Sequence, residues 1–177
     1  GLRLLMPLHR AHRSSKNGLA LPVSHQRFLI DRHLRPTARV SEGQWLNQKW
    51  LATSAIDLSD GLSGDLRHLC EASQVGAEVE LEKLPISAAC QAYGKAAGRS
   101  PVQLALSGGE DYELLFTAAP GSRSTIEQQA RARGYRVTCI GTIRPKRFGI
   151  QTSSGGKRHP LPVTSYEPAH CSPNSPH

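Results

Sequence analysis

The chain is most tightly constrained by the segment Asp57-Leu58-Ser59-Asp60-Gly61-Leu62. The apolar pair Ala55-Ile56 precedes this segment, which is typical of a short strand. After it, apolar residues recur at the i, i+4, i+7 and i+8 positions of one helix face, namely Leu62, Leu66, Leu69 and Cys70. The pattern predicts a strand over 54–56, a tight turn, and a helix from about residue 60 to residue 73.

This turn carries two carboxylates and one hydroxyl within four residues, from Asp57, Ser59 and Asp60. Hard cations such as Mg²⁺ prefer oxygen ligands and usually bind a protein through one or two carboxylates. Free backbone N–H groups at a helix start favour anions, so one turn could hold a phosphate together with its metal. The alternative is that Asp, Ser and Gly are simply common in strand-to-helix turns, with Ser59 or Asp60 as the N-cap.

A second segment, residues 107–117, joins a glycine pair to a run of acids and then to apolar residues. Gly108-Gly109 permits positive φ and a close approach of the backbone to a ligand. Three acids and a tyrosine fill the next four positions, although Asp and Glu are uncommon in strands. The alternative is a Gly-Gly turn followed by a solvated strand start, which suits Asp111 and Glu113 taken singly.

The remaining pattern predicts alternating helices and strands. Helices are expected over about 25–34, 41–51, 60–73, 86–97 and 122–133, and strands over 54–56, 77–81, 102–106, 112–117 and 135–143. Ser41 is predicted as an N-cap, and Gly76 and Gly98 are predicted to end helices. Trp45, Leu46, Ile126 and Ala130 are expected to point inward. After Arg144 an irregular chain is expected, with a disordered tail over 172–177.

These elements predict an α/β (α+β) class, in which a mixed, mainly antiparallel sheet carries helices on one face. With 177 residues and 38% hydrophobic content, one core is expected. No apolar run approaches the roughly 18 residues of a membrane span, and no secretory signal pattern is visible, so no membrane partner is expected. The four cysteines lack zinc-type spacing, and packed, reduced thiols are expected.

The formal net charge of +8 raises the question of a nucleic-acid partner. Basic residues concentrate in residues 3–16, 32–39 and 144–158. The chain holds only 3 Phe, 2 Trp and 4 Tyr, and none interleaves with the basic residues in a way that suits base stacking. Solvated basic loops, or the absence of an acidic partner domain, explain the charge more simply. No nucleic-acid partner is therefore expected.

Taken together and in this order, these segments resemble the C-terminal half of thiamine-monophosphate kinases. The resemblance covers about residues 27–145, and Ser-Asp-Gly-Leu alone would also fit several ATP-dependent synthetases of the same superfamily. Gly-Gly-Glu-Asp-Tyr-Glu-Leu points to the thiamine-phosphate enzyme. The matching stretches are Arg32-His33-Leu34-Arg35-Pro36-Thr37, Ala55-Ile56-Asp57-Leu58-Ser59-Asp60-Gly61-Leu62 with Asp65-Leu66, Ala105-Leu106-Ser107-Gly108-Gly109-Glu110-Asp111-Tyr112-Glu113-Leu114 and, more weakly, Ile140-Gly141-Thr142-Ile143.

The resemblance implies the C-terminal-domain fold of aminoimidazole ribonucleotide synthetase-like proteins. It also implies transfer of the ATP γ-phosphoryl group to thiamine monophosphate with Mg²⁺, giving thiamine diphosphate. By resemblance, Asp57 and Asp60 are metal ligands, Ser59 contacts the nucleotide phosphates, and Glu110 contacts the substrate. Tyr166 stands where the family places an aromatic against the thiamine rings, although its neighbours depart from the family pattern. No residue is assigned as a catalytic acid or base, since the acceptor phosphate is already ionised at neutral pH.

Family members are about twice as long as this chain, and their N-terminal domain supplies further aspartates and builds a homodimer. We therefore expect 1–24 to be a remnant of that domain with a linker, 25–165 to be the C-terminal kinase domain, and 166–177 to be a disordered tail. The expected enzyme is cytoplasmic, and this chain alone is expected to be an inactive fragment. The alternatives are a sister synthetase of the superfamily and a non-catalytic interaction remnant.

Overall fold

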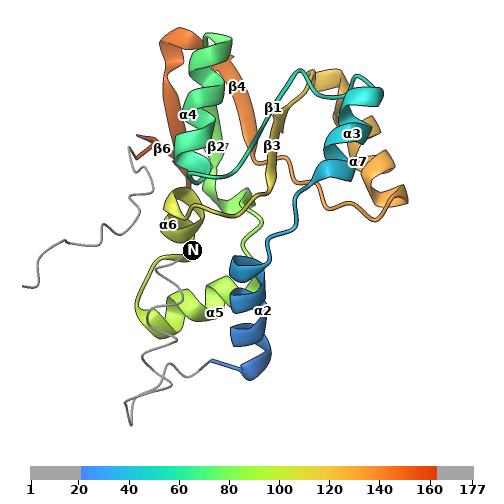
Figure 1. Cartoon of the computed structure of the whole chain (residues 1–177). Coiled ribbons are helices and arrows are strands. Elements are labelled where there is room, and N and C mark those ends of the chain that lie inside the picture. Colours follow the sequence, from blue (N-terminus) through green and yellow to red (C-terminus); the bar gives the residue numbers. More distant parts are fainter. Residues whose placement is uncertain (1–20, 163–177) are drawn as a thin grey trace, which may run out of the picture.

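A computed structural model describes residues 21–162, and it confirms the mixed α/β class (Figure 1). The strands form two sheets. In the first, β1 pairs antiparallel with β3. In the second, the order is β4-β2-β5-β6, with β2 antiparallel to β4 and parallel to β5. The elements are α2 (Val23–Leu34), α3 (Val40–Gln48), β1 (Ser54–Asp57), α4 (Leu62–Ser73), β2 (Val75–Glu80), α5 (Ala88–Ala97), α6 (Pro101–Ser107), β3 (Leu114–Thr117), α7 (Arg123–Ala132), β4 (Gly141–Pro145), β5 (Ile150–Ser154) and β6 (Lys157–Pro160).

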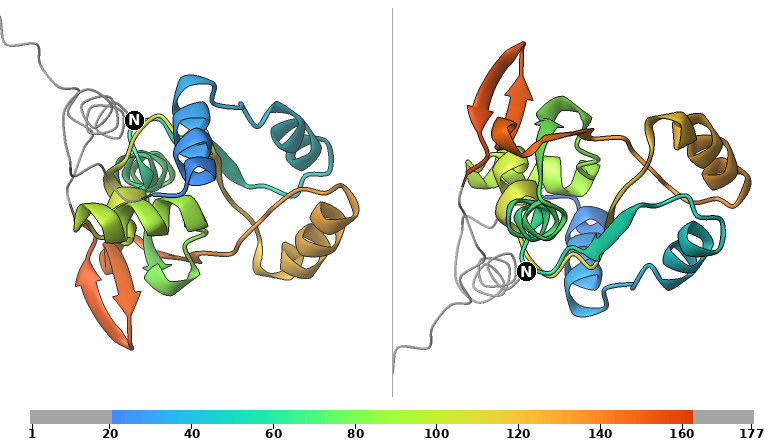
Figure 2. Two further views of the ribbon diagram at one scale, coloured as in Figure 1. Left: turned by 90° about the horizontal axis from the view of Figure 1, so that it is seen from below. Right: turned by 90° about the horizontal axis from the view of Figure 1, so that it is seen from above.

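Within residues 21–162, buried apolar side chains form three clusters, not the single core expected from the chain length. One lies between α4, α6 and the β2 sheet. It includes Leu62, Leu66 and Cys70 of the predicted stripe on α4, and the fourth residue of the stripe, Leu69, is also buried. A second joins α3 to α7 through Trp45, Leu46, Ile126 and Ala130, as predicted. The third joins α2 to α5. Figure 2 shows the helices that contribute to these clusters arranged around β1, with the β5–β6 hairpin projecting from one side.

Residues 102–106 form a helix, not the predicted strand. Their apolar pattern is too short to separate the two structures, and the residues before them decide the outcome. Ser100 is the N-cap of α6, and its hydroxyl accepts a hydrogen bond from the Gln103 backbone N–H at 3.3 Å. Pro101 occupies the first turn, where a missing N–H costs nothing. These two residues start α6 directly before the Gly-Gly segment.

Residues 135–140 do not form a strand, although strand β4 does begin at Gly141. Their alternating apolar side chains connect two clusters: Tyr135 and Val137 pack on the α3–α7 cluster, and Ile140 packs on the α4 cluster. The expectation of an irregular chain after residue 144 is also wrong, since β5 and β6 form a hairpin there. Gly155 and Gly156, with φ of 54° and 77°, make its turn. That glycine pair was the missed signal.

Two of the predicted helix caps are wrong. Helix α3 begins after Arg39 without a side-chain cap, so Ser41 is not its N-cap. Helix α4 ends at Gln74, which is left-handed with φ of 55°, while Gly76 lies inside β2. A Cβ on Gly76 would lie 2.4 Å from the Gly149 carbonyl oxygen, so this glycine permits a close strand approach. Gly98 does end α5, with φ of 63°.

No helix within residues 21–162 is long and apolar enough to cross a membrane. Cys70, Cys90 and Cys139 are free thiols, as expected. The remnant over 1–24 lies almost entirely outside the described residues, and the tail with Tyr166 lies wholly outside them.

Candidate functional site

The structure brings the two segments singled out in the sequence side by side. The Glu110 backbone N–H donates to the Ser59 carbonyl at 2.8 Å, and the Tyr112 N–H donates to the Leu58 carbonyl at 2.9 Å. In return, the Leu58 N–H donates to the Glu113 carbonyl at 2.8 Å. These bonds extend the β1–β3 pairing beyond its last strand pair, Asp57 with Leu114. The carboxylates of both segments are therefore attached to one backbone frame.

Gly61 allows this junction to close. It is the N-cap of α4, with φ of 95° and ψ of 158°, and no side chain caps the helix. The interpretation of Ser59 or Asp60 as N-cap is therefore wrong. A Cβ on Gly61 would lie 2.9 Å from the Gly108 carbonyl oxygen. Only glycine combines this backbone conformation with so close an approach of α4 to the end of α6.

Asp65, which the sequence analysis did not assign, supports the turn from inside the protein. Its carboxylate is buried and accepts a hydrogen bond from the Asp60 backbone N–H at 3.0 Å. Burial raises the pKa of Asp65, the Asp60 N–H lowers it, and the charges of Asp60 and Asp57 raise it further. An acid in the first turn of a helix was the available signal, since such acids favour the helix start.

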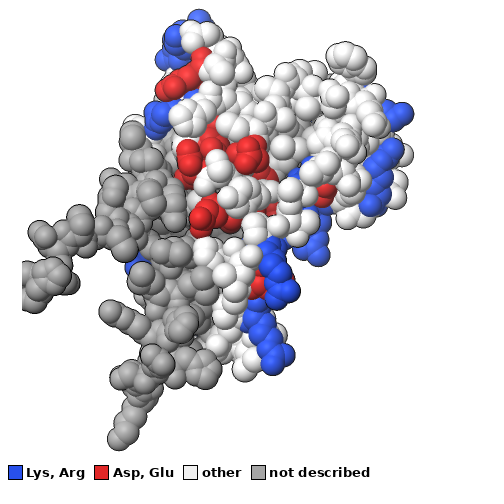
Figure 3. All heavy atoms as spheres, in the orientation of Figure 1, with Lys and Arg blue, Asp and Glu red and all other residues white. Residues whose placement is uncertain are grey.

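Asp57 and Asp60, the predicted metal ligands, are both exposed at this turn, and the Asp60 side chain is 55% accessible. Figure 3 shows acidic side chains gathered on this face over the junction of α4 and α6, while most basic side chains lie toward the edges. Within the described residues, no three His, Cys, Asp or Glu side chains come together as a complete metal site. Two exposed carboxylates fit a Mg²⁺ ion whose other ligands are water and phosphate oxygens.

The loop that follows Gly108-Gly109 is held in an unusual conformation. Glu110 and Tyr112 both have positive φ, at 66° and 51°, which is strained for residues other than glycine. Glu110 Oε2 is buried without a hydrogen-bond partner among the described residues and lies 3.6 Å from His33 Nδ1. Strain of this kind persists only where surrounding structure enforces it, and it is common at binding sites.

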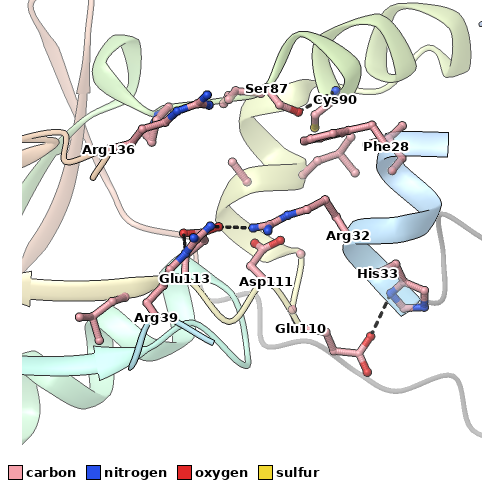
Figure 4. A pocket seen from close by; sticks show the side chains of 18 of the residues that line it. Phe28, Arg32, His33, Arg39, Ser87, Cys90, Glu110, Asp111, Glu113 and Arg136 are labelled. Carbon is pink, nitrogen blue, oxygen red and sulfur yellow. Dashed lines mark hydrogen bonds and ion pairs between the residues drawn. The ribbon is translucent and has the colours of Figure 1, made fainter. Parts of the chain in front are cut away.

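Beside this loop lies a pocket of about 980 Å³, bounded by α2, α3, α5, α6 and the segment after α7 (Figure 4). Its size is that of a small-molecule site. Aromatic and charged side chains share its wall. The aromatic ones are Phe28, Trp45, Tyr93, Phe116 and Tyr135, and the charged ones are Arg32, Arg39, Glu42, Arg99, Glu110, Asp111, Glu113 and Arg136, with His33 beside them.

Two arginines hold Glu113 on the pocket wall. Arg39 binds it with two hydrogen bonds, from Nε at 2.9 Å and from an Nη at 2.8 Å, and Arg32 donates a third. Arg39 also lies 3.5 Å from Glu42. The bidentate geometry and the third bond hold the Glu113 carboxylate in place directly before β3, while its side chain stays 43% accessible to solvent. Residue types alone gave no signal for this pairing across more than 70 residues.

Asp111 differs from the other acids of the pocket. Its carboxylate points into the pocket beside Arg32 (Figure 4), and no described residue forms an ion pair with it. Asp111 is exposed by its accessible surface, but nearby protein atoms partly desolvate its carboxylate. This desolvation, together with the charge of Glu113, raises the pKa of Asp111 to about 6, and Arg32 opposes the shift.

The family model for the C-terminal domain of AIR synthase related proteins matches residues 20–152. The chain belongs to this family. It resembles the thiamine-monophosphate kinases of Haemophilus influenzae, with 48% identity over 119 residues, and of Escherichia coli K12, with 46% identity over 116 residues. These matches cover 67% and 66% of this chain but 35% and 34% of the relatives. The chain therefore spans about a third of the length of the curated relatives it matches.

Solved structures agree with this assignment. AaThiL complexed with AMPPCP and TMP superposes with a TM-score of 0.71 at 30% identity, over 92% of this chain and 46% of that one. The thiamine-monophosphate kinase of Stenotrophomonas maltophilia K279a gives 0.69 at 35% identity, over 84% of this chain and 45% of that one. Escherichia coli HypE, a hydrogenase maturation protein, gives 0.63 at 15% identity and shares the fold alone.

Proposed function

We propose that this chain is the C-terminal part of a thiamine-monophosphate kinase, an enzyme that transfers the γ-phosphoryl group of ATP to thiamine monophosphate. Identities of 46–48% to two kinases of this name support the proposal. The observation that carries it is the shared frame of the two segments, in which the Ser59 carbonyl accepts from the Glu110 N–H at 2.8 Å. The frame supports the proposal because it holds the turn proposed to bind metal and phosphate beside the pocket proposed to bind the substrate.

The proposed roles follow from the position of each side chain. Asp57 and Asp60 would hold Mg²⁺, whose charge, when the ion is bound, offsets that of the two phosphate groups that must approach each other. Ser59 would contact the nucleotide phosphates at the same turn. Glu110, on the neighbouring loop, would contact the thiamine moiety. A phosphate oxygen of thiamine monophosphate forms the new P–O bond, and ADP leaves with the electron pair of the broken one.

Several further parts of the proposal rest on the family alone. We propose that residues 25–165 form the C-terminal domain, and that residues 1–24 belong to the end of a preceding domain and a linker. The whole enzyme is proposed to be a cytoplasmic homodimer with no nucleic-acid partner. Tyr166 remains a proposed contact to the thiamine rings, outside the described residues.

The metal assignment predicts that Asp57→Asn and Asp60→Asn each lower kcat at least a hundredfold, with small effects on stability because both side chains are exposed. Because this chain spans about a third of its relatives, turnover is measured after residues 20–152 replace the matching segment of the Escherichia coli relative. Asp31→Asn on the exposed face of α2 is the matched control and should leave kcat unchanged. Unchanged kcat in both site variants, or a folded but inactive unsubstituted exchange protein, would contradict the proposal.

The substrate assignment predicts a different kinetic signature for Glu110→Gln. Loss of a hydrogen bond to a charged group is worth about 1.5–3 kcal/mol, so KM for thiamine monophosphate should rise about tenfold or more. KM for ATP should change little, because the nucleotide is assigned to the neighbouring turn. An equal rise in both KM values would count against this role for Glu110.

A further inference from the structure

Four carboxylates line the pocket, and three of them already face a cationic or basic partner. Glu113 is held by Arg39 and Arg32, and Glu42 lies 3.5 Å from Arg39. Glu110 faces His33 Nδ1 at 3.6 Å. Asp111 has no ion pair among the described residues, although it points into the same pocket (Figure 4). Asp111 is thus the one acid of the four without a cationic or basic partner among the described residues.

We propose that Asp111 is the counter-ion for the cationic ring of the substrate and selects for that positive charge. This inference rests on the proposed function, since thiamine monophosphate carries a thiazolium ring whose nitrogen is alkylated and permanently charged. A cation that enters the pocket beside Asp111 would meet a carboxylate that is accessible and has no ion-pair partner among the described residues, so a charge pair can form without breaking an existing one. Phe28, from α2, lines the same pocket and would supply an aromatic contact to the bound cation.

Both positively and negatively charged side chains surround Asp111, and no described cationic side chain forms an ion pair with it. From α2, Arg32 and His33 share the pocket wall; Arg39 lies before α3, and Cys90 faces the pocket from α5. Glu110 and Glu113 belong to the loop of Asp111 itself. Arg32 and Arg39 make their hydrogen bonds to Glu113 and none to Asp111, although the charge of Arg32 still favours the ionised form of Asp111. Desolvation also holds the pKa of Asp111 at about 6, which leaves it mainly ionised at neutral pH.

The test compares two ligands with the same phosphate: thiamine monophosphate, and its neutral isostere in which a carbon atom replaces the thiazolium nitrogen. Affinities are measured by NMR titration of the 177-residue chain at pH 7.5. The unsubstituted chain should bind the cationic ligand about tenfold more tightly, equivalent to about 1.4 kcal/mol. In Asp111→Asn this preference should disappear, with affinity for the neutral isostere unchanged. Asp111→Glu should keep part of the preference, and Asp31→Asn should keep all of it.

The outcomes separate this inference from the proposed function. Equal affinity for both ligands in the unsubstituted chain, or a preference that survives in Asp111→Asn, would overturn the role of Asp111 and leave the kinase proposal standing. Binding of neither ligand by the unsubstituted chain would overturn the role of Asp111 and the assignment of this pocket to the substrate, whereas the kinase proposal is judged by the turnover of the exchange protein. Equal loss of both ligands in Asp111→Asn would assign Asp111 a structural role instead.

Discussion

Gly61→Ala should weaken the junction between the two site segments, and its cost has two sources. The first is conformational, because φ of 95° with ψ of 158° lies in a region open almost only to glycine and costs other residues about 1–3 kcal/mol. The second is steric. A Cβ would lie 2.9 Å from the Gly108 oxygen, 3.1 Å from the Ser107 carbonyl carbon and 3.2 Å from the Leu106 oxygen. These are all backbone atoms that cannot rotate away, so about 1–3 kcal/mol of overpacking is added.

The expected loss of unfolding free energy is therefore about 2–6 kcal/mol, a large part of the roughly 5–15 kcal/mol that stabilises a typical domain. Urea denaturation followed by circular dichroism measures it. Gly98→Ala is the matched control, because Gly98 also has positive φ, at 63°, but a Cβ there meets nothing within 4 Å. It should cost only about 1–2 kcal/mol. If Gly61→Ala costs no more than Gly98→Ala, the close approach of α4 to α6 is not as described here.

Three further substitutions test other parts of the structure. Glu113→Gln should remove charge-assisted hydrogen bonds to Arg32 and Arg39 and lower the free energy of unfolding in urea denaturation. The loss should be only about 1 kcal/mol, because solvent screens these bonds. Glu127→Gln, in an exposed pair with Arg123, should cost only about 0.3–0.5 kcal/mol. Hydrogen bonds from Arg158 and Arg144 lower the pKa of Glu78, so its contribution to stability is present above the ordinary glutamate pKa and is lost as the pH falls below it. Glu78→Gln should therefore flatten the acid side of the plot of unfolding free energy against pH. An unchanged plot would contradict this prediction. The pKa of Asp111 is raised instead, so the native state holds this proton more tightly than the unfolded state does. Stability should therefore fall as the pH rises from about 4 to about 6. Asp111→Asn should remove that fall, and a fall that persists in the variant would refute the raised pKa of Asp111.

The sequence predicted those elements whose own residues specify their structure. The stripe on α4 and the inward positions Trp45, Leu46, Ile126 and Ala130 are buried as expected, because helical periodicity reports directly on which face packs. Residues 102–106 differ from the prediction, because a five-residue apolar run fits a strand or a helix, and Ser100 and Pro101 before it start a helix.

The candidate site was likewise predicted from the sequence only in part. The acids of the Asp57 turn and of the Glu110 loop were found from composition and spacing, but their joining by backbone hydrogen bonds depends on β1–β3 pairing across more than 50 residues. The clamp of Arg32 and Arg39 on Glu113 was not found. Nor were the support of the turn by Asp65 and the lack of an ion-pair partner for Asp111 among residues 21–162. Each depends on which side chains the folded chain places together, which no local pattern reports.

Paramagnetic NMR on this chain tests most directly whether the two segments form one metal–phosphate site. Mn²⁺ can replace Mg²⁺ at oxygen ligands, and its complex with a non-hydrolysable ATP analogue broadens nearby amide signals even when binding is weak. We predict that broadening centres on residues 57–62 and 108–113 and disappears in the double variant Asp57→Asn, Asp60→Asn. Broadening centred elsewhere, or broadening of these residues that persists in the double variant, would contradict the account.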